Sequence, residues 1–112
     1  MTKTEVLNFI MAIHPHEHEE GVMRHWLEEL EAKICCELHH ASSRAPGAAE
    51  SDKLTVPAPY DRVYWTYLNA MLDLAAGNSE AYALSDKIYR EAYAEYAKYL
   101  QRSHGRMRRP KW

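Results

Sequence analysis

The stretch that most constrains this 112-residue chain is Leu54–Gly77, because both of its ends are marked. From Tyr60 onward its apolar residues recur at i, i+3 and i+4, a pattern typical of one face of an amphipathic helix. Pro59 suits the first turn of such a helix, and Gly77 offers the left-handed stop. We therefore predict a helix here, preceded by one short extended segment, Leu54–Val56. The apolar face is formed by Val63, Tyr64, Tyr67, Leu68, Met71, Leu72 and Ala75.

A second apolar series follows almost at once and predicts a partner helix. Asn78-Ser79 supplies an N-cap, and the helix should run without Gly or Pro to about His104, where Gly105 ends it. Because the link is so short, the two helices should pack antiparallel as an αα-hairpin. The side of the second helix that faces inward is predicted to carry Leu84, Ile88, Ala92, Tyr96 and Tyr99, widened by Tyr82, Tyr89 and Tyr93.

Two more helices are predicted ahead of the hairpin. Thr2 and Glu5 form a capping-box pattern at the start of a short helix that Pro15 ends. The next helix covers roughly Glu19–His40, and the small polar residues 41–52 predict a flexible loop. Its inward residues should be Met23, Trp26, Leu27, Leu30, Ile34 and Leu38, and its outer acidic face should be Glu28, Glu29, Glu31 and Glu37.

The charge is unevenly distributed, although the formal net charge is only −2. Residues 1–97 carry sixteen acidic and eight basic side chains, whereas residues 98–112 carry six basic and no acidic ones. We expect one all-α domain of four helices over residues 1–104 and a flexible basic tail over residues 105–112. Such a tail contacts a negatively charged partner or only keeps the chain soluble. The residues expected to dock on a partner are Arg102, Arg106, Arg108, Arg109, Lys111 and Trp112.

The sequence carries no sign of a membrane or secretory segment. It contains no apolar run of 18 residues, so no membrane span is expected. The first 15 residues lack the layout of a signal peptide, since acidic Glu5 stands where basic residues would be. Cys35 and Cys36 are adjacent, which favours reduced thiols in a cytoplasmic setting over a strained disulfide.

A metal site is one interpretation of the histidines and cysteines. Cys35/His39 and Cys36/His40 are i, i+4 pairs on a helix, a spacing that can bring two ligands to one metal together with the segment His14–His18. No Cys-x-x-Cys motif is present, however, and ordering ligands from two loops costs entropy. We therefore expect no metal and no cofactor.

Catalytic chemistry is also not expected. The pair of Cys36 and His40 has neither a third orienting group nor a glycine-rich loop in the sequence. Three aspartates are spread along the hairpin without a recognisable constellation: Asp61, Asp73 and Asp86. We expect no catalytic residues and a protein that is not an enzyme.

All eight tyrosines fall in the predicted hairpin. A domain of this size cannot bury eight phenols and satisfy every hydroxyl, so two readings stay open. In the first, about half of the tyrosines pack the hairpin and their hydroxyls reach water. In the second, the remaining tyrosines lie at a subunit interface, where tyrosine is enriched. The residues expected at that interface are Leu54, Val56, Tyr60, Tyr64, Tyr89 and Tyr93.

The segments Trp26–Ile34 and Leu54–Tyr82 resemble a group of small tailed-phage and prophage proteins regarded as head–tail connectors, or adaptors. The most specific part is the turn Val56-Pro57-x-Pro59-Tyr60-Asp61 joined to a tyrosine-rich helix. The resemblance implies a structural virion protein of the neck, made in the bacterial cytoplasm, that assembles as a ring around the DNA channel. Its implied partners are the portal protein and a downstream neck or tail protein, while DNA passes without specific binding.

Two other classes remain open. A small helical DNA-binding or regulatory protein would use the basic tail, although the last helix carries four acidic residues and is no basic recognition helix. A metal- or thiol-dependent enzyme would be built on Cys36, His40 and His14–His18. Salt-dependent DNA binding would favour the first class, and stoichiometric zinc the second.

Overall fold

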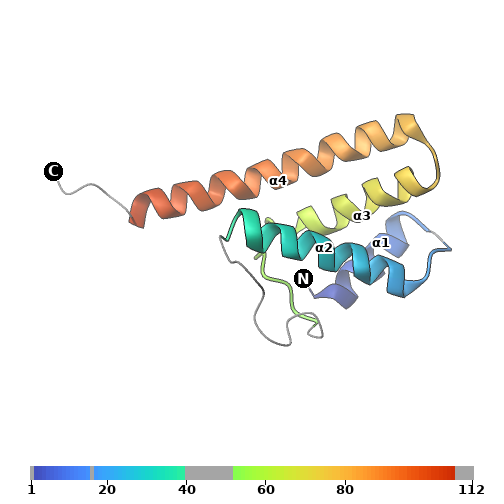
Figure 1. The fold of residues 1–112 in the computed structure, drawn as a ribbon, viewed down its shortest axis with the longest axis horizontal. Helices are drawn as coiled ribbons and strands as arrows, with labels where there is room; N and C mark the ends of the chain where they lie inside the picture. The colour runs from blue at the N-terminus through green and yellow to red at the C-terminus, as the bar shows by residue number, and fades with distance from the viewer. Residues whose placement is uncertain (1, 16, 40–51, 108–112) are drawn as a thin grey trace.

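The computed structural model describes residues 2–15, 17–39 and 52–107, with side chains up to Ser103, and it is all-α over that part. The helices are α1 (Lys3–Ile13), α2 (Glu20–Glu37), α3 (Arg62–Ala75) and α4 (Ser79–Met107) (Figure 1). The prediction of a small four-helix domain is confirmed. The predicted loop over residues 41–52 lies, except for Asp52, outside the described residues.

Local signals at the helix ends are confirmed. The Thr2 side chain accepts from the Glu5 N–H at 3.2 Å, and Glu5 Oε1 accepts from the Thr2 N–H at 3.1 Å, which completes a capping box. Asn78 Oδ1 accepts from the Ala81 N–H at 3.2 Å at the start of α4. Gly77 has φ +74°, so it adopts the left-handed conformation that stops α3.

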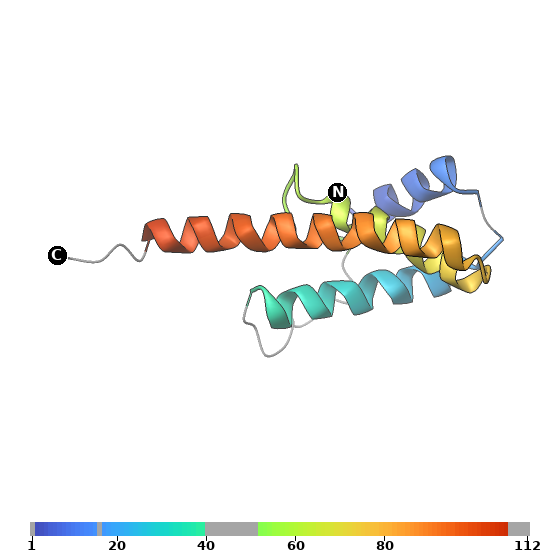
Figure 2. The ribbon, with the colours of Figure 1, turned by 90° about the horizontal axis from the view of Figure 1, so that it is seen from above.

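The helices α3 and α4 form the predicted hairpin, and α4 is much the longer of the two. At 1.5 Å per residue the 14 residues of α3 span about 21 Å and the 29 residues of α4 about 44 Å. The C-terminal part of α4 therefore extends past the other helices (Figure 1). Seen from above, α1 and α2 lie on opposite sides of α4 (Figure 2).

The core lies where the four helices meet. It takes side chains from all four, and Val56 joins it from the segment before α3. No helix in the described ranges is long and apolar enough to cross a membrane. The buried core residues are Val6, Leu7, Ile10, Met23, Leu27, Leu30, Ile34, Val56, Val63, Tyr64, Leu68, Leu72, Tyr89, Ala92 and Tyr96.

Three predicted helix limits were wrong. The helix α3 begins at Arg62, because the Tyr60 N–H bonds to the Pro57 carbonyl at 3.0 Å in a preceding turn. The helix α2 ends at Glu37 rather than near residue 40. The helix α4 continues through Gly105 to Met107, past the predicted domain limit at residue 104. A glycine inside a helix costs only about 1 kcal/mol. This cost does not end a long helix such as α4 at Gly105, because each further residue adds a backbone hydrogen bond.

The predicted extended segment, Leu54–Val56, forms no strand. The described residues contain one isolated antiparallel bridge, which joins Thr2 to Lys53. The Lys3 N–H donates to the Asp52 carbonyl at 2.8 Å, and Asp52 Oδ1 accepts from the Thr4 hydroxyl at 3.0 Å. The segment that leads into α3 is thus held against the start of α1.

The inward faces of α2 and α4 differ from the prediction at particular residues. Glu31 was assigned to the outer face of α2, but it is 0 % exposed. Leu84 and Ile88 were assigned to the core, but they are 64 % and 40 % exposed. The buried side of α4 carries Ser85, Tyr89, Ala92 and Tyr96 instead. Trp26, expected in the core, is only half-buried and packs at its edge.

Candidate functional site

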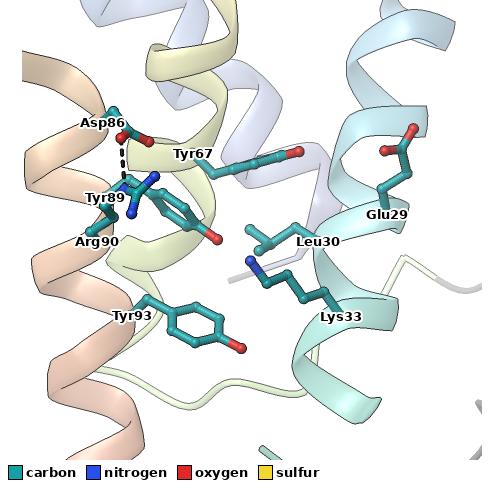
Figure 3. Close-up of a pocket in the computed structure, with 8 residues that line it drawn as sticks. All are labelled: Glu29, Leu30, Lys33, Tyr67, Asp86, Tyr89, Arg90 and Tyr93. Carbon is teal, nitrogen blue, oxygen red and sulfur yellow. Dashed lines mark hydrogen bonds and ion pairs between the residues drawn. The ribbon is translucent and has the colours of Figure 1, made fainter. Parts of the chain in front are cut away.

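A groove lies between α2 and the α3–α4 hairpin (Figure 3). Its cavity volume is about 690 Å³, within the range of ordinary ligand sites. We call it the tyrosine groove. It is lined by Glu29, Leu30 and Lys33 from α2, Tyr67 from α3, and Asp86, Tyr89, Arg90 and Tyr93 from α4.

Three phenol rings form one wall of the tyrosine groove. The ring centroids of Tyr67 and Tyr89 are 5.1 Å apart, and those of Tyr89 and Tyr93 are 6.1 Å apart. Tyr89 and Tyr93 lie four residues apart on α4 and so project from the same side of it. Figure 3 shows all three hydroxyls directed across the groove toward α2. Such a wall binds another aromatic ring well, because edge-to-face and offset contacts are favourable at these spacings.

The Tyr89 hydroxyl has an unmet hydrogen-bonding capacity. The residue is 7 % exposed, and its buried oxygen has no hydrogen-bond partner in the described part of the chain. Burial, with smaller effects of Tyr67 and nearby carboxylates, raises the pKa of this phenol well above its usual range. The hydroxyl therefore stays protonated at neutral pH. Buried polar atoms normally have partners, so an unpartnered one facing a groove is a binding feature.

Charged side chains of both signs surround the three rings. Lys33 Nζ lies 5.2 Å from the centre of the Tyr93 ring, and the Tyr93 hydroxyl donates to the Glu37 carboxylate. Arg90 Nε pairs with Asp86 Oδ2 at 2.7 Å (Figure 3). Glu29 lies 2.6 Å from a ring nitrogen of His25. The groove is thus an aromatic slot with a mixed polar rim, which suits a side chain that is both apolar and polar.

Behind the groove, a buried carboxylate joins α2 to α3. The Tyr64 hydroxyl donates to Glu31 Oε2 at 2.8 Å and accepts from the Val56 N–H at 2.9 Å. The Thr55 hydroxyl and, at 3.9 Å, the Cys35 thiol donate to Glu31 Oε1. Burial and the nearby Glu31 charge raise the pKa of the Cys35 thiol, so it stays protonated. A buried carboxylate that accepts several hydrogen bonds is a structural link, and it holds the segment before α3 in place.

Half of the expected interface set lies inside the subunit. Val56 and Tyr64 are 1 % and 0 % exposed, and Tyr89 shows little beyond its edge in the groove. Val56 and Tyr64 therefore expose almost no surface that a neighbour could contact. The Tyr64 ring packs in the core, and its hydroxyl donates to Glu31. The half-buried members of the set are Leu54, Tyr60 and Tyr93.

Tyr60 packs its ring against other aromatic residues of the same subunit. It stacks on Tyr99 with ring centroids 4.6 Å apart and lies 5.8 Å from Tyr96. The Tyr96 hydroxyl in turn contacts His39 Nε2 at 2.7 Å. This second aromatic cluster closes the far end of the hairpin against the end of α2.

Of the residues expected to dock on a partner, the structure places Arg102. It is exposed on the part of α4 that extends past α3. Arg106 belongs to the last turn of α4, but its side chain is not described. The remaining expected docking residues lie outside the described ranges: Arg108, Arg109, Lys111 and Trp112.

The cysteine–histidine pairs are not gathered into a ligand set. Cys35 is buried against Glu31 and Cys36 is exposed, so the two thiols face different surroundings. His39 contacts Tyr96, and His40 lies outside the described residues. Across residues 2–15, 17–39 and 52–107, no three His, Cys, Asp or Glu side chains converge as metal ligands would.

A polar cluster that the sequence did not reveal ties the end of α1 to the hairpin. His14 Nδ1 lies 2.6 Å from Asn69 Oδ1, and Asn69 Nδ2 donates to Ser85 Oγ at 3.3 Å. The Ser85 hydroxyl donates to Asp73, whose other oxygen lies 4.0 Å from His14 Nε2. Because Ser85 donates to a carboxylate and not to His14, the geometry of an activated nucleophile is missing. The cluster joins the end of α1 to both helices of the hairpin.

Comparison of the chain with protein-family models, with curated proteins and with solved structures finds no match.

Proposed function

We propose that this protein is a structural head–tail connector of a tailed phage or prophage, which assembles as a ring between the portal and the tail. The proposal starts from the resemblance of Leu54–Tyr82 to that group of adaptors. The observation that carries it further is an uncovered apolar pair on α4, Leu84 and Ile88, at 64 % and 40 % exposed. Because they lie four residues apart on one helix, the two side chains are neighbours on its surface and together form an apolar pair that another subunit could cover.

The two flanks of α4 support a ring in particular. Residues two positions apart on a helix point about 200° apart, so Leu84 and Ile88 lie on the flank opposite Asp86 and Arg90 of the tyrosine groove. One subunit thus carries two different surfaces on opposite sides of a single long helix. A ring closes through such head-to-tail contacts between unlike surfaces.

Charge supports the proposed position around DNA. Sixteen acidic side chains fall in residues 1–97, against eight basic ones. An acidic wall does not bind phosphates, so DNA could slide along it without specific binding. The portal contact is proposed for the basic end of α4, where Arg102 and Arg106 lie beyond α3. In this proposal the mature location is the virion neck, after synthesis in the bacterial cytoplasm.

The experiment is to image the purified protein by negative-stain electron microscopy, alone and with the portal of the phage genome that encodes it. Rings seated on the portal are the expected result. Ile88→Glu should abolish them, whereas Lys87→Glu, one position away on the exposed surface, should not. Portal particles without rings would refute the proposal. Salt-dependent DNA binding by the same sample would favour the alternative of a small DNA-binding protein.

A further inference from the structure

We propose that the tyrosine groove of one subunit binds Trp112 of a second copy of this chain. The proposal goes beyond the connector function, since it holds for any head-to-tail assembly of this chain, with or without a portal. It leaves Arg102 and Arg106, on the projecting end of α4, for the portal.

The groove is already formed in the single subunit. The buried Tyr89 hydroxyl faces it without a hydrogen-bond partner, and three aromatic rings are already in place around it. Its volume of about 690 Å³ has room for a large side chain and part of its backbone. Because Tyr89 is held between Tyr67 and Tyr93, its side chain loses little conformational entropy when the groove is filled.

An indole is the side chain that fits this chemistry. Its apolar rings pack edge-to-face or offset against phenols, and its N–H is a hydrogen-bond donor only. The Tyr89 oxygen can accept that hydrogen bond, which would satisfy the one buried hydroxyl of the groove that has no partner. Tryptophan and tyrosine are also the residues that contribute most to protein interfaces.

The chain cannot fill its own groove with Trp112. From Tyr89 to Met107 the helix rises by about 27 Å at 1.5 Å per residue. The five residues 108–112 span at most about 17 Å when fully extended. They would also have to reverse direction, so Trp112 falls short of the groove centre in the same molecule. A neighbouring subunit has no such limit.

The charges favour the same pairing. Four of the six residues before Trp112 are basic, while residues 1–97 carry twice as many acidic as basic side chains. At the groove itself, Glu29 belongs to the lining, and the Glu37 carboxylate accepts from the Tyr93 hydroxyl at its edge. The two basic side chains of the groove already have partners, because Arg90 pairs with Asp86 and Lys33 lies over the Tyr93 ring. Attraction between the body and the basic segment mainly raises the association rate.

The contact is heterologous, since Trp112 and the tyrosine groove are different parts of one chain. Each subunit donates one tail and offers one groove, so the association can propagate and closes only where the rotation allows a ring. A twofold dimer would not result from this contact unless both tails crossed at once.

The first test uses a fluorescent peptide of residues 105–112 and the full chain with Trp112→Ala, whose own tail cannot compete. Fluorescence anisotropy should show binding that weakens at least tenfold when the peptide carries Trp112→Ala. Tyr93→Ala in the protein should weaken it by a similar factor, and Tyr89→Phe by several-fold. Tyr82→Phe, a tyrosine outside the groove, should change it less than twofold. Equal binding by the two peptides, or by the Tyr93→Ala protein, would overturn the proposal.

The second test mixes two full-chain variants in sedimentation velocity. Trp112→Ala keeps the groove, and Tyr93→Ala keeps the tail, so neither variant can make the tail–groove contact by itself, and each should remain monomeric when no portal is present. Their equimolar mixture should form a heterodimer and nothing larger. A mixture that stays monomeric, or single variants that associate like the wild type, would contradict the inference. If the portal binds no ring but the peptide binds the groove, only the connector proposal fails, and the reverse result removes only the tail contact.

Discussion

Tyr64→Phe should destabilise the protein far more than the loss of one oxygen atom suggests. The Tyr64 hydroxyl has two buried partners, the Glu31 carboxylate at 2.8 Å and the Val56 N–H at 2.9 Å. Phenylalanine leaves both without that partner in a site where Glu31 and Tyr64 are 0 % exposed. A hydrogen bond to a carboxylate contributes about 1.5–3 kcal/mol, and an orphaned buried N–H costs about 1–3 kcal/mol. We therefore expect a loss of about 3–5 kcal/mol.

The assay is urea unfolding followed by circular dichroism at neutral pH. A domain of this size is stable by roughly 5–15 kcal/mol, so the expected loss moves the midpoint far to lower urea. Tyr82→Phe is the matched control, since its hydroxyl makes no comparable buried contact, and it should change stability by less than about 0.5 kcal/mol. A double-mutant cycle with Glu31→Gln should show strong coupling to Tyr64→Phe. A Tyr64→Phe variant as stable as the control would refute the role given to this network.

Four further predictions concern stability. Trp26→Ala should cost about 2 kcal/mol in urea unfolding, less than the 3–5 kcal/mol of a fully buried tryptophan, because the ring is half-buried; a larger loss would place it in the core. Burial, followed by the Glu31 charge, raises the pKa of Tyr96 to about 12. Unfolded tyrosine ionises near pH 10, so the contribution of Tyr96 to the free energy of unfolding is complete below pH 10. Between pH 10 and 12 this contribution should fall by up to about 1.4 kcal/mol per pH unit. Unchanged stability over that window would contradict it. Deleting residues 108–112 should leave the melting temperature within a few degrees of the wild type by calorimetry, and a large drop would mean that this segment stabilises its own domain. Replacing four residues together should likewise leave the melting temperature nearly unchanged by calorimetry, with or without zinc: His16, His18, Cys36 and His40. A large drop that zinc reverses would contradict this.

The hairpin could be predicted because its signals are local. A capping residue, a glycine that must adopt positive φ and a link of a few residues each act within one or two turns. Asn78 and Gly77 therefore behave as their sequence context predicts. The antiparallel packing of α3 and α4 follows from the shortness of the link alone.

The rotation of each helix was harder to predict, because neighbouring apolar series share residues. On α4, the series 84-88-92-96 and 85-89-92-96 differ only at their first two positions, by about 100° of rotation. Hydrophobicity favours Leu84 and Ile88. The structure takes Ser85 and Tyr89, because Ser85 hydrogen-bonds to Asp73 and Asn69, and Tyr89 packs on Tyr67. Contacts with α3 determine the rotation of α4 about its axis, and the periodicity of a single helix contains no information about such contacts.

Glu31 left a signal in the sequence that charge alone obscured. It lies four residues after Leu27 and three before Ile34, and so on the buried stripe of α2. A glutamate on that stripe requires buried donors, and a tyrosine-rich partner helix supplies one in Tyr64. A glutamate on a buried helix face, together with a tyrosine-rich neighbouring helix, therefore predicts a contact such as that between Glu31 and Tyr64. The tyrosine groove had no such signal, since its residues come from three helices.

The Glu31 network also limits how the chain can assemble. It holds Thr55 and Val56 against the core, with the Val56 N–H already bonded to Tyr64. A strand from a neighbour needs free backbone donors, so strand addition at Leu54–Val56 would first have to break this network. The sequence analysis predicted an interface at that segment, and in the structure these hydrogen bonds add to the cost of forming one there. The long helix α4 is the better candidate, because the Leu84–Ile88 pair and the tyrosine groove are already open on its two flanks.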